Sequence, residues 1–363
     1  MGELEAFIDA GLYDPDAPNA AERREYLEFL LGRGHSVADI INAAQDGNPD
    51  VLFHIAWDLR APSPPRISAK EIAERSGGSL EDLLEMRALF GVPVSDPEAP
   101  EIPETFLADF NLFLMACGLW GRDNTLGYAR TIGAAVTMLT EGGRELVLTP
   151  LRTRNATETD IAVSNEFAMG AWQAMRDVVS NLMREQPGRA DWFSENLLRG
   201  EFTMGVAFVD LVDSTDWTTS VGEASHRQAL GRFEHEAARL AAKHDCRVVK
   251  FIGDEAMVAG HDAAAVATVV ACLCAFVAAD DVLPGTRAAI GFGEVTPRGG
   301  DYFGDLVNLV ARATKAAPVD GIVATESVVT RLVPSQWCIS APRAVSLRGV
   351  GDVELYDIRA ADA

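Results

Sequence analysis

The amino-acid sequence predicts two structural classes in one chain, an all-α first half followed by an α+β second half. Three observations support this prediction. Residues 1 to 186 contain repeated helix-start signals and apolar residues at helical spacing. Residues 204 to 359 instead alternate apolar runs of strand length with longer helical patterns. The breaker pair Pro187-Gly188 stands where the pattern changes, so we expect a linker over residues 187–203.

The composition is that of a folded, strongly acidic protein. Its 363 residues, 48% of them hydrophobic, are enough for two domains of ordinary size. The net charge of -23 and the isoelectric point near 4.6 argue against nucleic-acid and anionic-membrane partners, because both bind basic surfaces. The five cysteines have no zinc-site spacing, and we expect them to be reduced core residues.

Two features favour a cytoplasmic location without a membrane span. The amino terminus is acidic and lacks the basic start and apolar centre of a signal peptide. The most apolar run, Ala263 to Ala279, falls short of the roughly 20 residues that a membrane helix needs. We expect this run to be a helix buried in a globular core.

The first half is predicted to form several short helices. Helix starts of the serine-x-x-acid type occur at Ser36, Ser68 and Ser79. The segment Ser68 to Val92 has the helix, Gly-rich turn and helix of a helix-turn-helix motif, but its second helix opens with acidic residues. Because those acids would meet DNA phosphates, we prefer a packing unit in a helical bundle to a DNA-binding motif.

Two later segments of this half are apolar enough to be helices. Pro103 to Leu119 is rich in Phe and Leu, which favours a buried helix over a lipid-lined groove. Ser164 to Glu185 carries an apolar stripe at helical spacing, suited to packing or to dimerisation. We expect this second helix to end at Pro187-Gly188.

The second half is predicted to form a mainly antiparallel sheet with helices packed on it. Strands are expected over 203–212 and 286–295, a hairpin over 246–259, helices over 223–244, 262–279 and 305–316, and further short strands up to Ile358. In the hairpin, Gly253-Asp254 separates two apolar runs, as in a tight turn. Lys250 shares a strand face with Ile252, so a cation faces a surface that should be apolar.

Two carboxylates stand at the ends of predicted strands. Asp210 closes an apolar run typical of a buried strand, and Asp254 lies on the hairpin turn. Acids placed in this way can hold Mg2+, which prefers oxygen ligands and usually takes only one or two carboxylates from the protein. A solvated turn explains Asp254 equally well, so the residues alone leave both interpretations open.

The predicted helix after the Gly-rich stretch carries a second polar group. Asn308 and Arg312 lie one turn apart on one helix face. Arginine supplies a permanent charge and asparagine a neutral hydrogen bond, which suits a phosphoryl group and a ribose. An ordinary surface pair is the alternative. Asp301 lies just upstream, between Gly300 and Gly304, where glycines let the backbone approach a ligand.

Three motifs taken together resemble, in order and spacing, the catalytic domain of class III nucleotidyl cyclases. They are Phe208-Val-Asp210-Leu-Val, Lys250-Phe-Ile-Gly253-Asp254-Glu255-Ala-Met257 and Asp301-Tyr-Phe-Gly304-Asp-Leu-Val307-Asn308-Leu-Val-Ala-Arg312. The resemblance covers roughly residues 200 to 358. It implies a ferredoxin-like palm fold for this domain and a reaction that converts ATP to 3',5'-cyclic AMP and pyrophosphate.

The same resemblance implies a role for each site residue. Asp210 and Asp254 are expected to bind two divalent metal ions, Mg2+ or Mn2+. Lys250 and Asp301 are expected to read the base. The remaining expectations are that Asn308 orients the ribose, that Arg312 stabilises the pentavalent phosphate, and that Arg348 lies near the terminal phosphates.

The base-reading pair favours adenine. A lysine donates and an aspartate accepts, which matches the N1 acceptor and N6 donor of adenine, whereas guanine presents the opposite pattern. A mismatched base leaves buried polar groups unpaired, at about 1 to 3 kcal/mol each. A guanylyl cyclase, a silent nucleotide-binding module, and a diguanylate cyclase suggested by Ile252-Gly-Asp-Glu-Ala256 remain the alternatives.

The resemblance also implies an assembly and its control. In this family the metal-binding acids and the Lys250-type residue come from one protomer and the Asn308 and Arg312 types from the other, which implies a homodimer. The helical half, especially Arg154 to Ala162, is similar to the autoinhibitory domain of actinobacterial cyclases that respond to acidic pH. The resemblance implies a regulatory domain over 1–186 and a switch in the 187–203 linker, with the effector open between a proton and a lipid.

Overall fold

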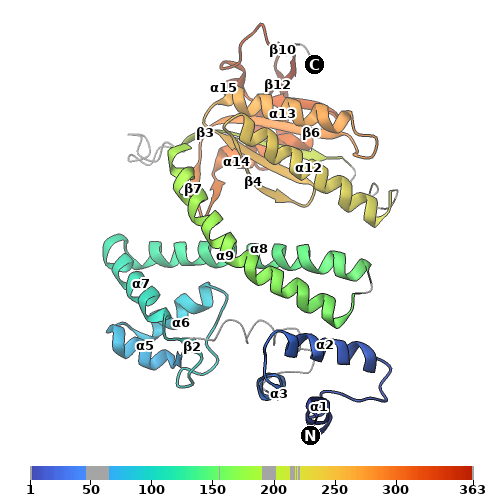
Figure 1. Cartoon of the computed structure of the whole chain (residues 1–363). Coiled ribbons are helices and arrows are strands. Elements are labelled where there is room, and N and C mark those ends of the chain that lie inside the picture. Colours follow the sequence, from blue (N-terminus) through green and yellow to red (C-terminus); the bar gives the residue numbers. More distant parts are fainter. Residues whose placement is uncertain are drawn as a thin grey trace. The chain divides into compact units, whose positions relative to one another are not determined.

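The computed structural model describes residues 2–45, 65–154, 156–189, 202–212, 217, 219 and 221–361. The chain divides into two compact units, Met1–Glu185 and Gln186–Ala363 (Figure 1). The described part of the first unit is helical apart from two short strands, and the second unit mixes strands and helices. The predicted order of an all-α half and an α+β half is therefore confirmed. Of the predicted linker, residues 190–201 lie outside the described residues.

Two hydrophobic clusters organise the first unit. Its elements are α1 (Glu3–Asp9), α2 (Ala20–Gly32), α3 (Val37–Gln45), β1 (Arg66–Ile67), α5 (Ala69–Ser76), α6 (Leu80–Leu89), β2 (Ile102–Pro103), α7 (Phe106–Trp120), α8 (Arg122–Thr153) and α9 (Glu158–Arg189). Phe7, Tyr26 and Leu30 are at the centre of the cluster that joins α1, α2 and α3. Ile72 and Phe110 belong to the cluster that joins α5, α6, α7 and α8.

The predicted helix starts are confirmed by their hydrogen bonds. The hydroxyl of Ser36 accepts from the amide of Asp39 at 3.1 Å, and the Asp39 carboxylate accepts in return from the Ser36 amide at 3.3 Å. The hydroxyls of Ser68 and Ser79 likewise accept amides three residues on, at 3.1 and 3.2 Å. Each bond satisfies a backbone donor that the first helical turn would otherwise leave without a partner.

The two helices of the suspected helix-turn-helix segment form a packing unit. Gly77 ends α5 with φ 70°, a left-handed conformation that favours glycine. The acids near the start of α6 face α8, where the guanidinium of Arg122 donates to Asp82 at 2.7 Å and also pairs with Glu85. These acids therefore hold two helices together.

Helix α7 is buried on one side only. Phe110 and Phe113 are buried, but four large apolar side chains further round the helix are exposed. They are Leu112, Met115, Leu119 and Trp120. The prediction of a buried helix was therefore half wrong, because α7 packs on α5 and α8 through a single stripe.

Ion pairs connect α2 to the first half of α9. The guanidinium of Arg23 donates to both carboxylate oxygens of Glu158, at 2.7 and 2.6 Å, and these side chains are only 22% and 14% exposed. Arg33 pairs with Glu166 at 3.0 Å. A bidentate pair of this kind fixes direction as well as distance.

Helix α9 differs from its prediction at the carboxyl end. It continues to Arg189 instead of stopping at Pro187-Gly188. Proline removes one backbone donor and crowds the preceding turn, and the helix ends two residues after it. Its predicted apolar stripe is exposed in this chain, with Phe167 at 79% and Leu182 at 50%.

The second unit is built on a mainly antiparallel sheet. Its elements are β3 (Thr203–Leu211), α12 (Glu223–Lys243), β4 (Arg247–Ile252), β5 (Glu255–Gly260), α13 (Ala263–Ala278), β6 (Thr286–Glu294), β7 (Thr296–Arg298), β8 (Asp301–Phe303), α14 (Asp305–Ala316), β9 (Gly321–Ala324), α15 (Glu326–Val329), β10 (Trp337–Ile339), β11 (Arg343–Leu347) and β12 (Gly351–Ala360). Among the described residues the strand order is β10-β12-β9-β6-β3-β5-β4, with β11 on β12, and only β6 and β9 pair in parallel.

The sheet separates two cores. On one face α12 and α13 lie side by side and pack through Phe233 and Val270 onto Val209 of β3 (Figure 1). On the other face α14 packs through Val310 onto Phe208. Successive residues of β3 point to opposite faces, so both faces of this central strand are buried.

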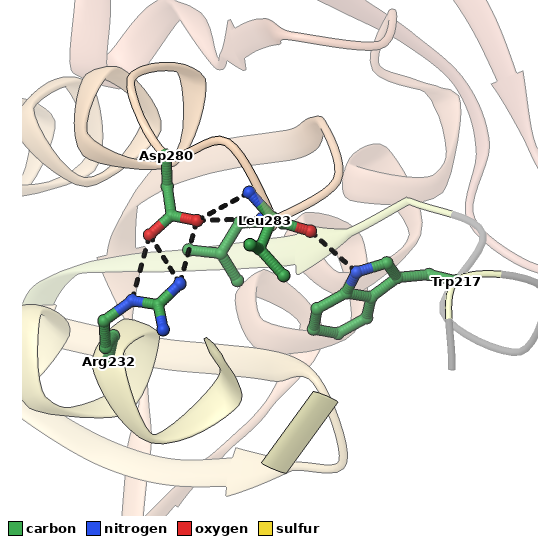
Figure 2. A network of polar contacts seen from close by, with 5 residues as sticks. Trp217, Arg232, Asp280 and Leu283 are labelled. Atoms are coloured by element: carbon green, nitrogen blue, oxygen red, sulfur yellow. Dashed lines mark hydrogen bonds and ion pairs between the residues drawn. The ribbon is translucent and has the colours of Figure 1, made fainter. Parts of the chain in front are cut away.

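A polar network ties α12 to the connection between α13 and β6. Figure 2 shows Arg232 and Asp280 facing each other. The Arg232 guanidinium donates hydrogen bonds of 2.8 to 3.0 Å to the Asp280 carboxylate. The Asp280 carboxylate also accepts the amides of Val282 and Leu283. The indole of Trp217 donates to the Val282 carbonyl at 2.8 Å, which attaches the chain beyond β3 to this connection.

The composition led to expectations about the cysteines and about membrane-spanning helices. All five cysteines are free, as expected. Cys117, Cys246 and Cys274 are half-buried against the hydrophobic clusters, but Cys272 and Cys338 are exposed, so the prediction of a core position was wrong for these two. In the part of the chain that the structure describes, no helix has the length and apolar character needed to cross a membrane.

Candidate functional site

The end of β3 and the β4–β5 turn bring two predicted acids to one place. Asp210 is 8% exposed at the end of β3. The two-residue turn has Gly253 at φ 64° in its first position, where a type II′ hairpin turn needs glycine. The carbonyl of Asp254 accepts the amide of Leu211 at 3.4 Å, which places the turn beside the strand end.

A third acid adjoins them. Glu255 lies directly opposite Asp210 in the β3–β5 register, so their side chains share the α14 face of the sheet. Its Oε1 atom is buried and has no hydrogen-bond partner among the described residues. Burial raises the pKa of Glu255, Lys315 opposes this rise, and Asp210 and Asp254 add to it.

A lysine from α14 reaches this acidic group. Lys315 Nζ donates to Asp210 Oδ2 at 2.8 Å and lies 4.0 Å from Glu255 Oε1. Burial by itself would lower the pKa of Lys315, but its hydrogen bond to Asp210 and the nearby charges of Glu255, Asp210 and Asp254 raise it above the ordinary value. The ammonium is therefore held in its charged form.

The residues fit a hard divalent cation. Among the described residues no group of three or more His, Cys, Asp or Glu side chains is arranged as a metal site. Mg2+ usually takes only one or two carboxylates from a protein and completes its shell with water and phosphate. Two neighbouring carboxylates, beside a buried Glu255 oxygen without a donor, meet that requirement.

The lysine on an apolar strand face has a partner. Lys250 Nζ of β4 donates to Asp301 Oδ2 of β8 at 2.5 Å, and it lies 5.9 Å from the ring centre of Phe303. Lys250 is paired across the sheet with Met257 and, through it, with Phe208. This set of paired residues faces α14 and lies next to the pair of Asp210 and Glu255. Both members of the predicted base-reading pair thus come from the same chain.

Helix α14 presents the remaining predicted residues. Gly304, at φ 126°, precedes the helix, and its carbonyl accepts the amide of Asn308 at 3.1 Å. Asn308 and Arg312 are both exposed. The Arg312 guanidinium donates to the backbone carbonyl of Arg348, in the turn between β11 and β12. The side chain of Arg312 therefore contacts the backbone of Arg348, and both residues are predicted to bind phosphate groups.

One chain assembles the candidate site in three parts. Asp210 and Asp254 lie together, Lys250 and Asp301 form a pair, and Arg312 touches the turn of Arg348. No hydrogen bond or ion pair among the described residues links one part to another. A further cation, Lys315, was not predicted, although it lies on the stripe of Asn308 two turns further along the helix.

Comparisons with known proteins give relatives along almost the whole chain, although no protein-family model matches the sequence. An uncharacterized protein of Mycobacterium tuberculosis is 26% identical over 99% of this chain and 96% of its own length. A pH-sensitive adenylate cyclase of M. tuberculosis is 29% identical over 98% of this chain and 92% of its own length. The resemblance to pH-responsive actinobacterial cyclases is therefore confirmed.

Among solved structures, an adenylate cyclase from Trypanosoma brucei is similar to part of the chain. It is 19% identical, with a TM-score of 0.40, and the match covers 43% of this chain and 87% of the solved chain.

Proposed function

We propose that this chain is a class III adenylyl cyclase, which converts ATP to 3',5'-cyclic AMP and pyrophosphate. The observation that carries the proposal is its similarity, along nearly the full length of both proteins, to a pH-sensitive adenylate cyclase. The positions of the acids and the base-reading pair support it. Asp210 and Asp254 adjoin at one strand end, and Lys250 and Asp301 lie within hydrogen-bond distance.

Asp210 and Asp254 are the proposed ligands of two divalent ions, Mg2+ or Mn2+. Bound there, the ions would neutralise phosphate charge and favour loss of the proton from the ribose 3'-hydroxyl. The protein's part is to hold two carboxylates in place from a buried strand and a tight turn. Because both elements are fixed by sheet hydrogen bonds, the acids are positioned before substrate arrives.

Lys250 and Asp301 select adenine in this proposal. In the free chain each satisfies the other at 2.5 Å. On binding, the ammonium donates to N1 of the base and the carboxylate accepts from the N6 amino group. Guanine offers a hydrogen at N1 and an acceptor at O6, so it would leave donors and acceptors of the pocket facing like groups.

The residues of α14 act on the sugar and phosphates. In the reaction the 3'-oxygen forms a bond to the α-phosphorus, the bond to the pyrophosphate oxygen breaks, and one proton passes to solvent. Asn308 is proposed to orient the ribose, and Arg312 to stabilise charge on the α-phosphate in the transition state. Arg348 is proposed to bind the terminal phosphates. In this proposal the reaction is accelerated by positioning of the substrate and by neutralisation of its phosphate charge.

A homodimer is the proposed working unit. The acids, the base-reading pair and Arg312 form separate groups within one chain, with no bond between the groups in its described part. Two copies facing each other can bring the acids of one to the α14 residues of the other, and two sites result from such a twofold pair. The surface position of Asn308 and Arg312 agrees with a role across an interface.

The helical unit is proposed to control activity. Its long helix α9 leads directly into the linker before the catalytic unit, so a change of helix packing can reach the second unit through the chain. Either a proton or a lipid could act on it; the exposed apolar side chains of α7 and α9 favour a lipid or a second copy as a contact.

Product identification tests the proposed activity. Purified full-length protein is incubated with ATP or GTP and with Mg2+ or Mn2+, and the nucleotide products are identified by mass. Cyclic AMP from ATP is the expected result. Cyclic GMP or cyclic di-GMP would establish one of the other cyclases, and no product with either nucleotide would leave a silent binding module.

A further inference from the structure

Lys315 approaches the candidate metal acids from the solvent side. Its ammonium lies 2.8 Å from Asp210 Oδ2 and 4.0 Å from Glu255 Oε1. Its own side chain is 60% exposed, whereas those of Asp210 and Glu255 are 11% and 13% exposed. A long exposed side chain therefore caps two carboxylates that are largely enclosed by protein.

The packing of α14 explains why the lysine is there. Val307, Val310 and Ala313 are buried against the sheet face that carries Asp210, and they fix the rotation of the helix. Lys315 lies in the last turn of this helix, and its long side chain reaches Asp210 at the end of β3. The contact therefore follows from the fold of the second unit alone.

We propose that Lys315 is a built-in counter-cation that takes the place of a divalent ion at Asp210, so that a metal ion binds only by displacing its ammonium. The inference rests on the proposed role of Asp210 as a metal ligand. In the metal-free chain the ammonium offsets the mutual repulsion of Asp210, Asp254 and Glu255. A divalent ion at Asp210 repels the ammonium, and the flexible stem lets it move out into water.

Two opposite effects follow from this competition. Lys315 lowers the affinity of the site for metal, because its ion pair with Asp210 must be broken first. It also stabilises the metal-free chain, because without it three carboxylates are left near one another. A purely structural surface pair would produce the second effect without the first.

The direct test is a Mn2+ titration of the full-length protein without nucleotide, with free Mn2+ measured by electron paramagnetic resonance. K315M should tighten Mn2+ binding about two- to fivefold, the range expected for losing an exposed ion pair. K315R, which keeps the charge, should bind Mn2+ as the natural protein does. K243M should also leave the affinity unchanged, since Lys243 ends α12 on the opposite sheet face. Unchanged or weaker Mn2+ binding by K315M would overturn the proposal.

A second readout uses thermal unfolding of the same variants. In chelator K315M should have a lower Tm than the natural protein, and Mn2+ should raise its Tm by more. D210N separates this inference from the proposed function. If D210N binds Mn2+ as the natural protein does, the metal role of Asp210 is wrong. If D210N loses Mn2+ while K315M behaves as the natural protein does, only the role of Lys315 is wrong.

Discussion

Single residues at this site are explained by the partners they face. Lys250 looks misplaced on an apolar strand face until Asp301 is seen 2.5 Å away. Asp210 and Glu255 face each other across two strands, and Lys315 balances them. Lys250, Asp210 and Glu255 thus each have an opposite charge within 4.0 Å, which offsets the cost of burying a charge.

Base selection can be tested at Lys250. K250M removes the proposed donor to adenine N1 and leaves Asp301 without its cation. We expect kcat/KM for ATP to fall by about ten- to a hundredfold, the cost of about 1 to 3 kcal/mol for an unpaired buried group. Enzyme kinetics with ATP and with GTP measure the effect.

The control for this substitution is R247M. Arg247 begins the same strand and contacts the Tyr302 ring and the Gly300 carbonyl. R247M therefore removes a neighbouring cation but leaves both residues of the base-reading pair, Lys250 and Asp301, in place. An equal loss in K250M and R247M, or an equal loss with both nucleotides, would contradict the role of Lys250 in base selection.

The sequence was informative about residues whose role depends on near neighbours in the chain. Asp210 at a strand end, Asp254 on a Gly253 turn, and the pair on α14 could all be placed by spacing. Lys315 could not, because its contact with Asp210 depends on how α14 crosses a sheet whose strand order is not contiguous in sequence. Contacts between distant segments are set by packing that a local pattern does not contain.

The helices likewise differ in how well the local sequence predicts them. The helix over 305–316 has the predicted bounds, because Gly304 and an apolar stripe define its start and its buried face. Helix α7 was expected to be buried because of its composition, but the chain covers only its Phe110 face. Helix α9 passes Pro187 by only two residues, close to the end that the breaker pair predicted.

The network between α12 and the α13–β6 connection gives a test at this scale. D280N removes the charge that accepts from Arg232 and from the Val282 and Leu283 amides. We expect the free energy of unfolding to fall by about 1 to 3 kcal/mol, the range for hydrogen bonds to a charged group. Chemical denaturation of D280N measures this loss, and D281N is the matched control, since Asp281 is exposed next to it.

The effect of D280N should depend on pH. Burial would raise the pKa of Asp280, but the Val282 amide, Arg232 and the Leu283 amide together hold it below the ordinary value. The carboxylate therefore stabilises the fold above its unfolded pKa of about 4, and this contribution is lost as pH falls through the lower folded pKa. The difference between the natural protein and D280N should be full at pH 7 and shrink below about pH 4. A difference that stays constant across this range would contradict the assignment.

The whole molecule consists of a helical unit and a catalytic unit, and the boundary between them, after Glu185, falls within α9. If the helical unit restrains activity, the packing of α2 on α9 should affect the rate of the reaction. The Arg23–Glu158 pair is the best-defined contact between these helices, being bidentate and largely enclosed. This pair therefore offers a way to alter the helical unit without changing the catalytic residues.

E158Q tests control by the helical unit. It weakens the link between α2 and α9, so we expect higher cyclase activity near neutral pH and a shifted pH–activity profile. E28Q is the control, because the Arg24–Glu28 pair lies within α2 and is about half exposed. Profiles of full-length E158Q and the natural protein that superimpose would refute control through this contact.

We propose that this chain forms cyclic AMP from ATP at Asp210 and Asp254. The most direct test of this proposal is the rate of cyclic AMP formation from ATP by the natural protein and D210A, with Mn2+ and with chelator. We expect cyclic AMP only from the natural protein with metal, while D210A keeps the same circular dichroism spectrum and forms none. Undiminished cyclic AMP formation by folded D210A, or by the natural protein in chelator, would contradict it.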